Sequence, residues 1–189
     1  MKPILSAVII NYKTKHLIKS CLDHLLKQTQ PNLEIIFIDN LSQDGSAEYV
    51  RDNFPQVKLV ANQENLGYAK AANQGIEISK GDFVMILNPD IVLLPDYIEK
   101  CLKRMHQDHK IAAICGKVKK YDFEANKPTN FIDTVGIYCY RNRRFIDAGQ
   151  GLEDQGQFNE AHEVFGISGA CPIYRRTALE DVKIMGEYL

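Results

Sequence analysis

Asp90 is the acid whose position most directly suggests chemistry. It lies in FVMILNPDIVLLPDY (residues 83–97), where an apolar run stops at Asn88 and resumes directly after the acid. A carboxylate beside a buried strand is costly to desolvate unless a metal ion or several hydrogen-bond donors meet it. Taken alone, Asn-Pro-Asp is more typical of a plain turn after a strand, so the surrounding sequence must decide between the two interpretations.

Other polar residues stand at the ends of earlier apolar runs. Asn11 and Tyr12 follow the first run, and Asp39 closes the second, in IDNLSQDGS (residues 38–46). An acid at such a place can accept hydrogen bonds from a ribose hydroxyl or from the N–H group of a pyrimidine ring. A loop acid that caps a turn or the following helix would give the same pattern, so both interpretations stay open at this point.

The elements that must position these residues alternate between two periodicities. β-Branched runs predict strands, and apolar residues three and four apart predict amphipathic helices. The expected strands span 5–12, 33–39, 57–62 and 82–88. The expected helices span 15–28, 46–54, 67–80 and 95–108, the last with Pro95 in its first turn. This alternation predicts a parallel sheet covered by helices on both faces, with ligands beyond the carboxyl ends of the strands.

The pattern changes after residue 121. Residues 122–165 are polar with short aromatic and β-branched pieces, which predicts irregular strands and loops beside the main sheet. The run RNRR (141–144) is expected to form a solvated hairpin turn, and RTALEDV (176–182) a helix. No linker, repeat or low-complexity tract divides the chain, so we expect a single domain.

The composition excludes several classes of protein. The chain has 189 residues, 45% hydrophobic and 25% charged, with a net charge of -1, so we expect a soluble domain without a general attraction to nucleic acid or to anionic membranes. Its five cysteines form no CxxC pair and are expected to be reduced and mostly buried. We expect neither a signal peptide nor a transmembrane segment, and therefore a cytoplasmic protein.

Two common nucleotide-binding motifs are absent. A dinucleotide-binding fold needs a glycine-rich turn after its first strand, but here that turn is NYKTKH. The phosphate-binding GxxxxGK[ST] motif is also missing. The cofactor is therefore not expected to be a dinucleotide.

Five segments together resemble the family 2 glycosyltransferases of the GT-A fold. They are AVIINYK, IDNLSQDGS, NQENLGYAKAANQGI, LNPDI and GISGACPIYRRTAL, in the order that the family carries them. Within the family they look most like rhamnosyltransferase-type members. The resemblance implies an α/β, mostly parallel sheet in one GT-A domain over 1–189, with a nucleotide-sugar-binding half at 1–121 and an incomplete acceptor-side half at 122–189. A C-terminal truncation is expected.

The resemblance also implies site residues. The residues expected to bind the nucleotide are Asn11, Tyr12, Asp39, Asn65, Gly67 and Asn88. Asp90 would bind Mg²⁺ or Mn²⁺ where the family carries a DxD motif, with an amide in place of its first acid. His162 and Gly169 are expected on the acceptor side.

The catalytic residues stay unknown at this stage. The resemblance implies a general base within an acidic motif, and this motif does not occur up to Leu189. The general base is therefore expected beyond Leu189. Glu180 and Asp181 are assigned to the solvent face of their helix, and Arg175 and Arg176 either contact phosphate or open that helix. The chain alone is therefore expected to lack part of the machinery.

The implied function is inverting, metal-assisted transfer of a sugar from a UDP- or dTDP-linked donor to an acceptor hydroxyl, in polysaccharide biosynthesis. The acceptor would be a saccharide or a lipid-linked molecule, not nucleic acid, and peripheral attachment to the inner face of the membrane is a further option. Two alternatives remain: a non-catalytic module that binds nucleotide sugars, and a sugar-nucleotide nucleotidylyltransferase, which would want a glycine-rich, basic loop in place of NYKTKH.

Overall fold

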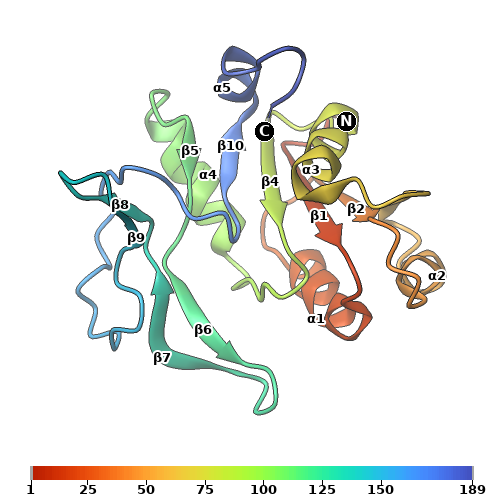
Figure 1. Ribbon diagram of the computed structural model, residues 1–189, viewed down its shortest axis with the longest axis horizontal. Helices are drawn as coiled ribbons and strands as arrows, with labels where there is room; N and C mark the ends of the chain where they lie inside the picture. The colour runs from red at the N-terminus through yellow and green to blue at the C-terminus, as the bar shows by residue number, and fades with distance from the viewer. Residues whose placement is uncertain (1, 189) are drawn as a thin grey trace.

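The computed structural model describes residues 2–188 and contains one main sheet with helices on both faces (Figure 1). Its helices are α1 (Lys15–Leu26), α2 (Ser46–Asn53), α3 (Gly67–Ile78), α4 (Tyr97–Gln107) and α5 (Arg176–Asp181). Its first five strands are β1 (Leu5–Asn11), β2 (Leu33–Asp39), β3 (Lys58–Ala61), β4 (Phe83–Leu87) and β5 (Ala113–Ile114). The others are β6 (Val118–Asp122), β7 (Lys127–Thr134), β8 (Ile137–Cys139), β9 (Phe145–Asp147) and β10 (Ile173–Arg175).

The sheet has the order β3-β2-β1-β4-β10-β5, in which β1 to β4 run parallel. The predicted α/β fold with a mostly parallel sheet is therefore confirmed. The register pairs Asn11 with Asp39 and Asp39 with Ala61, so the strands end side by side at one edge. The arrowheads of β1 and β4 in Figure 1 mark this carboxyl edge. The polar residues at the strand ends are consequently neighbours.

Two apolar clusters hold the helices on opposite faces of the sheet. Alternate residues of a strand point to opposite faces, so Ile9 packs with α1, α2 and α4 while Ile10 packs with α3 and α5. Both strand residues are nearly or fully buried. A continuous apolar run such as that of β1 is what a strand covered on both faces requires.

Helix α4 begins two residues later than predicted. Pro95 lies before the helix, and Asp96 is its N-cap residue, whose carbonyl accepts the first helical hydrogen bond from Lys100 at 3.0 Å. The carbonyl of Pro95 instead accepts a hydrogen bond from the amide of Thr29 at 2.9 Å. The turn before α4 is thus fixed by a contact to the end of α1 that the local pattern does not contain.

Strand β10 is the main feature that the sequence did not predict. It lies antiparallel between β4 and β5, with Ile173 opposite Met85 and Ile114. Arg175 donates from its guanidinium to the carbonyls of Met105 and Ile111, at 2.8 and 3.1 Å. Arg176 likewise donates to the carbonyl of Gly81 at 2.6 Å and to Ser79. These arginine groups therefore join elements of the fold and are not turned toward a phosphate.

Residues 118–147 form two antiparallel hairpins beside the main sheet, β6–β7 and β8–β9 (Figure 1). The predicted helix at the end of the chain is present as α5. In the part of the chain from residue 2 to residue 188, no helix is long and apolar enough to cross a membrane.

Candidate active site

A cavity of about 440 Å³ opens at the carboxyl edge of the sheet. Its lining comes from the ends of β1, β2 and β4, from α1, and from the start of α3. The residues that line it are Ile10, Tyr12, Thr14, Leu17, Asn40, Asn65, Gly67, Tyr68, Asn88, Pro89 and Asp90. Five of these carry a predicted role: Tyr12, Asn65, Gly67, Asn88 and Asp90.

Tyr12 offers an aromatic face at the mouth of this cavity. It follows β1, is 46% exposed, and has the Nζ atom of Lys13 5.1 Å from its ring centre. Hydrogen bonds with Lys13 and Asn65, together with the positive charge of Lys13, lower the pKa of the Tyr12 hydroxyl. An exposed ring held in this way can stack on a nucleobase.

Asn40 organises the loop that forms the next wall of the cavity. Its side-chain nitrogen donates to Oδ1 of Asn65 at 2.8 Å, and its side-chain oxygen accepts from the amide of Leu66 at 3.0 Å and from Asn62 at 3.1 Å. Asn40 itself is 3% exposed. Asn40 was not among the predicted site residues, although an amide directly after the acid that closes a strand was a usable signal.

Gly67 begins α3 with φ at +76°, a conformation that L-residues with a side chain rarely adopt. Its amide donates to Oδ1 of Asn65 at 2.9 Å. The amides of Leu66 and Gly67 are therefore already satisfied by side chains of this wall. The two residues shape the cavity, and any contact to a phosphate would fall to neighbouring groups.

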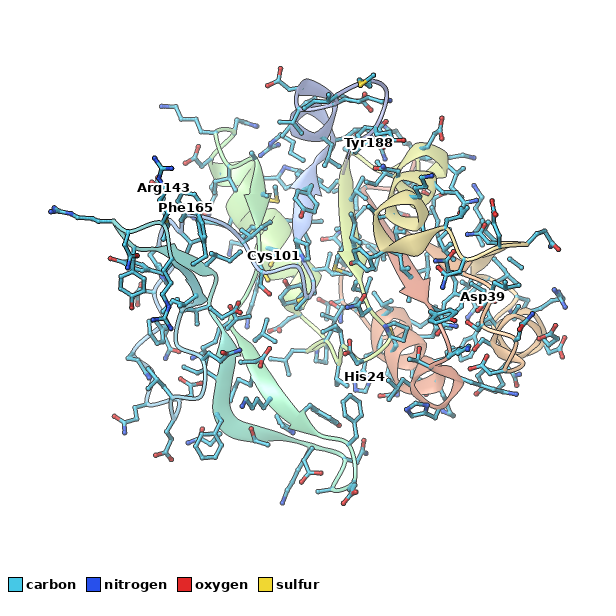
Figure 2. All side chains as sticks on the ribbon, in the orientation of Figure 1. His24, Asp39, Cys101, Arg143, Phe165 and Tyr188 are labelled. Carbon is cyan, nitrogen blue, oxygen red and sulfur yellow. The ribbon has the colours of Figure 1, made fainter. Side chains whose placement is uncertain are left out.

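Asn11 and Asp39 lie behind the cavity lining and bind each other. The side-chain nitrogen of Asn11 donates to Asp39 at 2.9 Å and to Ser42 at 2.8 Å, while the Ser42 amide donates to the second oxygen of Asp39 at 3.2 Å. Thr14 donates to the side-chain oxygen of Asn11 at 2.6 Å. Figure 2 labels Asp39 on the side of the molecule where α2 lies. Their nucleotide-binding role stays a prediction.

Asp90 is an exposed carboxylate at the opposite wall, just beyond β4. Within residues 2–188 it has no hydrogen bond or ion pair to another side chain. The buried Cys21 thiol lies below, where Sγ approaches the Asn88 carbonyl at 4.0 Å. Burial, aided by the negative charge of Asp90, raises the pKa of Cys21 to about 12. Asp90 is thus available to a ligand while the thiol beneath it is inert.

The donor set at Asp90 fits one kind of cation. The described residues 2–188 contain no cluster of three histidine, cysteine or acidic side chains. A metal at Asp90 would therefore take one carboxylate from this chain and its other oxygens from a phosphate or from water. Mg²⁺ is commonly held in this way, by one or two carboxylates and the phosphates of a substrate.

Tyr68 is a second lining residue that was not predicted from the sequence. It follows Gly67 in the first turn of α3 and is 46% exposed. Partial burial, and then the negative charge of Asp90 together with Tyr174, raises the pKa of its hydroxyl. Its phenol therefore stays protonated and can donate a hydrogen bond across the cavity.

The two predicted acceptor-side residues are not part of this cavity. His162 is exposed, and its Nδ1 atom lies 3.2 Å from the carbonyl of Glu160. Gly169 is exposed as well, and a Cβ atom added there would meet nothing within 4 Å. Close backbone approach does not explain this glycine, and the acceptor-side role of both residues stays a prediction.

Comparison with known proteins assigns the family. The profile of Glycosyl transferase family 2 matches residues 6–183. The chain belongs to this family. Among curated relatives, this family 2 glycosyltransferase is 31% identical over 144 residues to the glycosyltransferase GlyG of Streptococcus pneumoniae, covering 74% of the chain and 46% of GlyG. It is 28% identical over 171 residues to a chondroitin synthase of Escherichia coli, covering 84% of the chain and 24% of that protein.

Solved structures give the same fold at lower identity. The mannosyltransferase PcManGT of Pyrobaculum calidifontis, in complex with GDP-Man and Mn²⁺, matches 96% of the chain and 47% of its own with a TM-score of 0.64 at 21% identity. The TarS 1-349 structure of S. aureus with UDP-GlcNAc matches 96% of the chain and 47% of its own, with a TM-score of 0.66 at 18% identity. The chain spans less than half the length of these proteins. The family and the GT-A fold are confirmed, and the rhamnosyltransferase-type likeness stays a prediction.

Proposed function

We propose that this chain binds a nucleotide-diphosphate sugar, UDP- or dTDP-linked, and is the donor-binding part of an inverting glycosyltransferase that acts on a saccharide or lipid-linked acceptor. One observation carries the proposal. In a chain of family 2, a single cavity at the carboxyl edge brings together an aromatic face at Tyr12, amides at Asn65 and Asn88, and an unpaired carboxylate at Asp90. The base of a donor requires an aromatic face, its ribose requires a hydrogen-bonding amide, and its diphosphate requires a group that can hold a cation.

Each group has a separate task in this proposal. Tyr12 stacks on the base, and Asn88 hydrogen-bonds a ribose hydroxyl. A divalent ion at Asp90, when bound, neutralises the charge that develops on the diphosphate leaving group. The Tyr68 hydroxyl, facing the same space, donates a hydrogen bond to the diphosphate or the sugar. The walls exclude part of the water around the donor, which strengthens these polar contacts.

The general base is assigned outside this cavity. Asp90 is the one carboxylate among its described lining residues, and it is committed to the cation. Glu180 accepts a hydrogen bond from the Tyr188 hydroxyl at 2.8 Å, and Asp181 is exposed at the end of α5. Neither lines the cavity, so no general base is assigned among residues 2–188.

The same observation favours a second candidate function, a module that binds the donor without catalysing transfer. A cavity with one carboxylate can hold a donor and a cation but has no second acid to accept the proton of an attacking hydroxyl. Donor turnover separates the two candidates. If the chain is part of a glycosyltransferase, we expect slow hydrolysis or transfer of the donor that depends on Asp90. If it is a binding module, we expect no turnover of the donor. Membership of family 2 argues against the nucleotidylyltransferase alternative.

A calorimetric titration tests the proposed site. UDP and dTDP are titrated with Mn²⁺, with Mg²⁺ and with a chelator, into the wild type, Asp90→Ala and the control Asp52→Ala. Asp52 is an exposed acid of α2 and is not among the residues that line the cavity. We expect the cation to strengthen binding in the wild type and in Asp52→Ala but not in Asp90→Ala. Equal nucleotide affinity under all conditions would refute the metal role, and no binding at all would refute the donor site.

A further inference from the structure

The β8–β9 hairpin and the segment beside it expose a group of large aromatic side chains. Phe165 is 69% exposed, Tyr138 55%, Phe145 54% and Tyr140 44%. All exposed phenylalanines of the described residues lie between residues 122 and 165, outside the main sheet. Exposing this much aromatic surface in one place is unfavourable unless something covers it.

These aromatic rings are arranged in two pairs on the two faces of the hairpin. Tyr138 and Tyr140, two residues apart, lie on one face with ring centres 5.0 Å from each other. Phe145 is paired with Cys139 in the hairpin and therefore lies on the other face, where its ring centre is 5.2 Å from that of Phe165. The hairpin thus presents an apolar aromatic surface on both sides and not a single face for one groove.

Three arginines occupy the turn between the two strands. Arg141, Arg143 and Arg144 are all exposed, and none of them forms an ion pair or donates from its guanidinium within residues 2–188. The turn itself is ordered by a hydrogen bond of 2.9 Å from the Tyr140 amide to the Arg144 carbonyl. With Asp147 as its one acid, the stretch 137–147 has a formal charge of +2, while the segment 160–165, which carries Phe165, adds the exposed acids Glu160 and Glu163.

The hairpin is separate from the candidate active site. None of its residues lines the cavity, and it follows β6 and β7 on the outer side of β5 (Figure 1). Figure 2 shows Arg143 and Phe165 close together at one margin of the molecule and Asp39 toward the opposite margin. A ligand held by the hairpin would therefore leave the cavity open.

We propose that the β8–β9 hairpin binds the surface of an anionic phospholipid bilayer. Tyrosine and phenylalanine side chains suit the boundary between headgroups and acyl chains, and arginines are attracted to anionic headgroups while their stems cover apolar surface. The surface of an anionic bilayer offers headgroup phosphates to the arginines of the turn and an apolar boundary to the aromatic rings beside them. The proposal goes beyond the donor-binding function and does not depend on it.

Other partners fit these observations less well. A nucleic acid would gain from the arginines, but the chain's net charge of -1 provides no wider basic surface for a long polyanion. An apolar protein partner would bury the arginines without counter-charges, which is costly. A second copy of the chain brings the same +2 hairpin and would repel it.

Vesicle co-sedimentation tests the proposal. The chain is mixed with vesicles of phosphatidylcholine alone and with vesicles that also contain phosphatidylserine. We expect binding to the anionic vesicles only, weakened by salt. The triple variant Arg141→Gln, Arg143→Gln, Arg144→Gln should bind about a hundredfold more weakly, from roughly one kcal/mol for each arginine near an anionic surface. The control Arg51→Gln, Lys103→Gln, Arg104→Gln removes as much charge from α2 and α4 and should bind as the wild type does.

A fluorescence measurement tests the proposal without the triple arginine variant, whose weaker binding could also result from misfolding. The chain contains no tryptophan, so Phe165→Trp introduces a single reporter, and Leu26→Trp at the exposed end of α1 is its control. We expect the emission of Phe165→Trp, and not of Leu26→Trp, to shift to the blue on anionic vesicles. The proposal would be overturned by equal binding to neutral and anionic vesicles, by equal binding of the two triple variants, or by an unchanged emission of Phe165→Trp. A preference for an oligonucleotide or for a second copy of the chain would overturn it as well.

Discussion

The side-chain amide of Asn40 donates a hydrogen bond of 2.8 Å to the side-chain oxygen of Asn65, and this contact joins the end of β2 to the loop before α3. The side-chain oxygen of Asn40 simultaneously accepts from the Asn62 side chain and from the Leu66 amide. One buried amide thus holds a wall of the candidate active site in place. These contacts are all made within the protein, so the wall is held in place before a ligand binds.

Asn40→Ala should therefore weaken both the fold and the ligand site. The free energy of unfolding should fall by about 1–3 kcal/mol, because buried groups of the loop lose their partner. Nucleotide affinity should fall as well, since Asn65 loses its support. Urea unfolding and calorimetry measure the two effects. Asn53→Ala is the control, because that side chain makes a single, exposed hydrogen bond to the Tyr49 carbonyl. Equal stability of the two variants would contradict the prediction.

Asp39→Ala should also destabilise the chain, because this carboxylate is part of a buried hydrogen-bond network. Asp39 is 5% exposed and accepts hydrogen bonds from Asn11 and Ser42, so its loss should cost about 1–3 kcal/mol of unfolding free energy. Ser42→Ala disturbs the same network and keeps the carboxylate. If Asp39 binds the nucleoside, Asp39→Ala should lose more UDP affinity than Ser42→Ala does. Similar affinities of both variants would leave Asp39 with a structural role alone.

The fold was predictable to the extent that it is local. The four strand and helix pairs were found from their own periodicity, since a strand covered on both faces must be apolar throughout and an amphipathic helix must repeat every three to four residues. Strand β10 was missed because it has three residues, Ile173–Arg175, and exists only through pairing with β4 and β5. Its partners are far away along the chain, and no local pattern records them.

The site was predictable where it depends on strand ends. Parallel strands end at one edge, so Tyr12, Asn88 and Asp90 were expected to be neighbours, and all three line one cavity. The sequence does not reveal which polar side chain faces that space and which one binds another side chain. Asn11 and Asp39 are paired in the register of β1 and β2, and their side chains hydrogen-bond to each other. Asn40, one position further along the chain, instead positions Asn65 in the cavity wall.

Asp154 should give the chain a measurable pH dependence of stability. The hydrogen bond from Lys117, at 2.7 Å, together with the Gly156 amide and Lys119, lowers the pKa of Asp154 to about 2. Because this pKa lies below that of an unfolded chain, near 3.9, the contribution is complete above about pH 4 and is lost as the pH falls toward 2.

The variant Asp154→Asn makes this dependence visible. Its melting temperature should be lower than that of the wild type at pH 7, and the difference should shrink between about pH 4 and pH 2. Asp147→Asn, an exposed acid of β9, is the control and should follow the wild type at every pH. If the difference in melting temperature between the wild type and Asp154→Asn stays constant down to about pH 2, Asp154 acts through packing and not through its charge.

Cys115 should react more readily at neutral pH than Cys21 and Cys101 do. A hydrogen bond with Cys171 is the largest cause that lowers its pKa, to about 7, and the Tyr97 hydroxyl, 3.9 Å from its sulfur, contributes in the same direction. Burial raises the pKa of Cys21 and of Cys101 to about 12. Since the thiolate is the nucleophile, alkylation of Cys115 should rise through pH 7, while Cys21 and Cys101 should react only after unfolding.

Mass spectrometry of the chain after short exposure to iodoacetamide, at a series of pH values, measures this order. Cys171→Ala removes the hydrogen bond that lowers the pKa of Cys115 most, so the pKa of that thiol should rise and its alkylation curve should move to higher pH. The urea-unfolded chain is the reference, in which the thiols lose these contacts and should react alike. Should Cys115 in the folded chain react no faster at pH 7 than in the unfolded chain, the hydrogen bonds to its sulfur do not stabilise its thiolate.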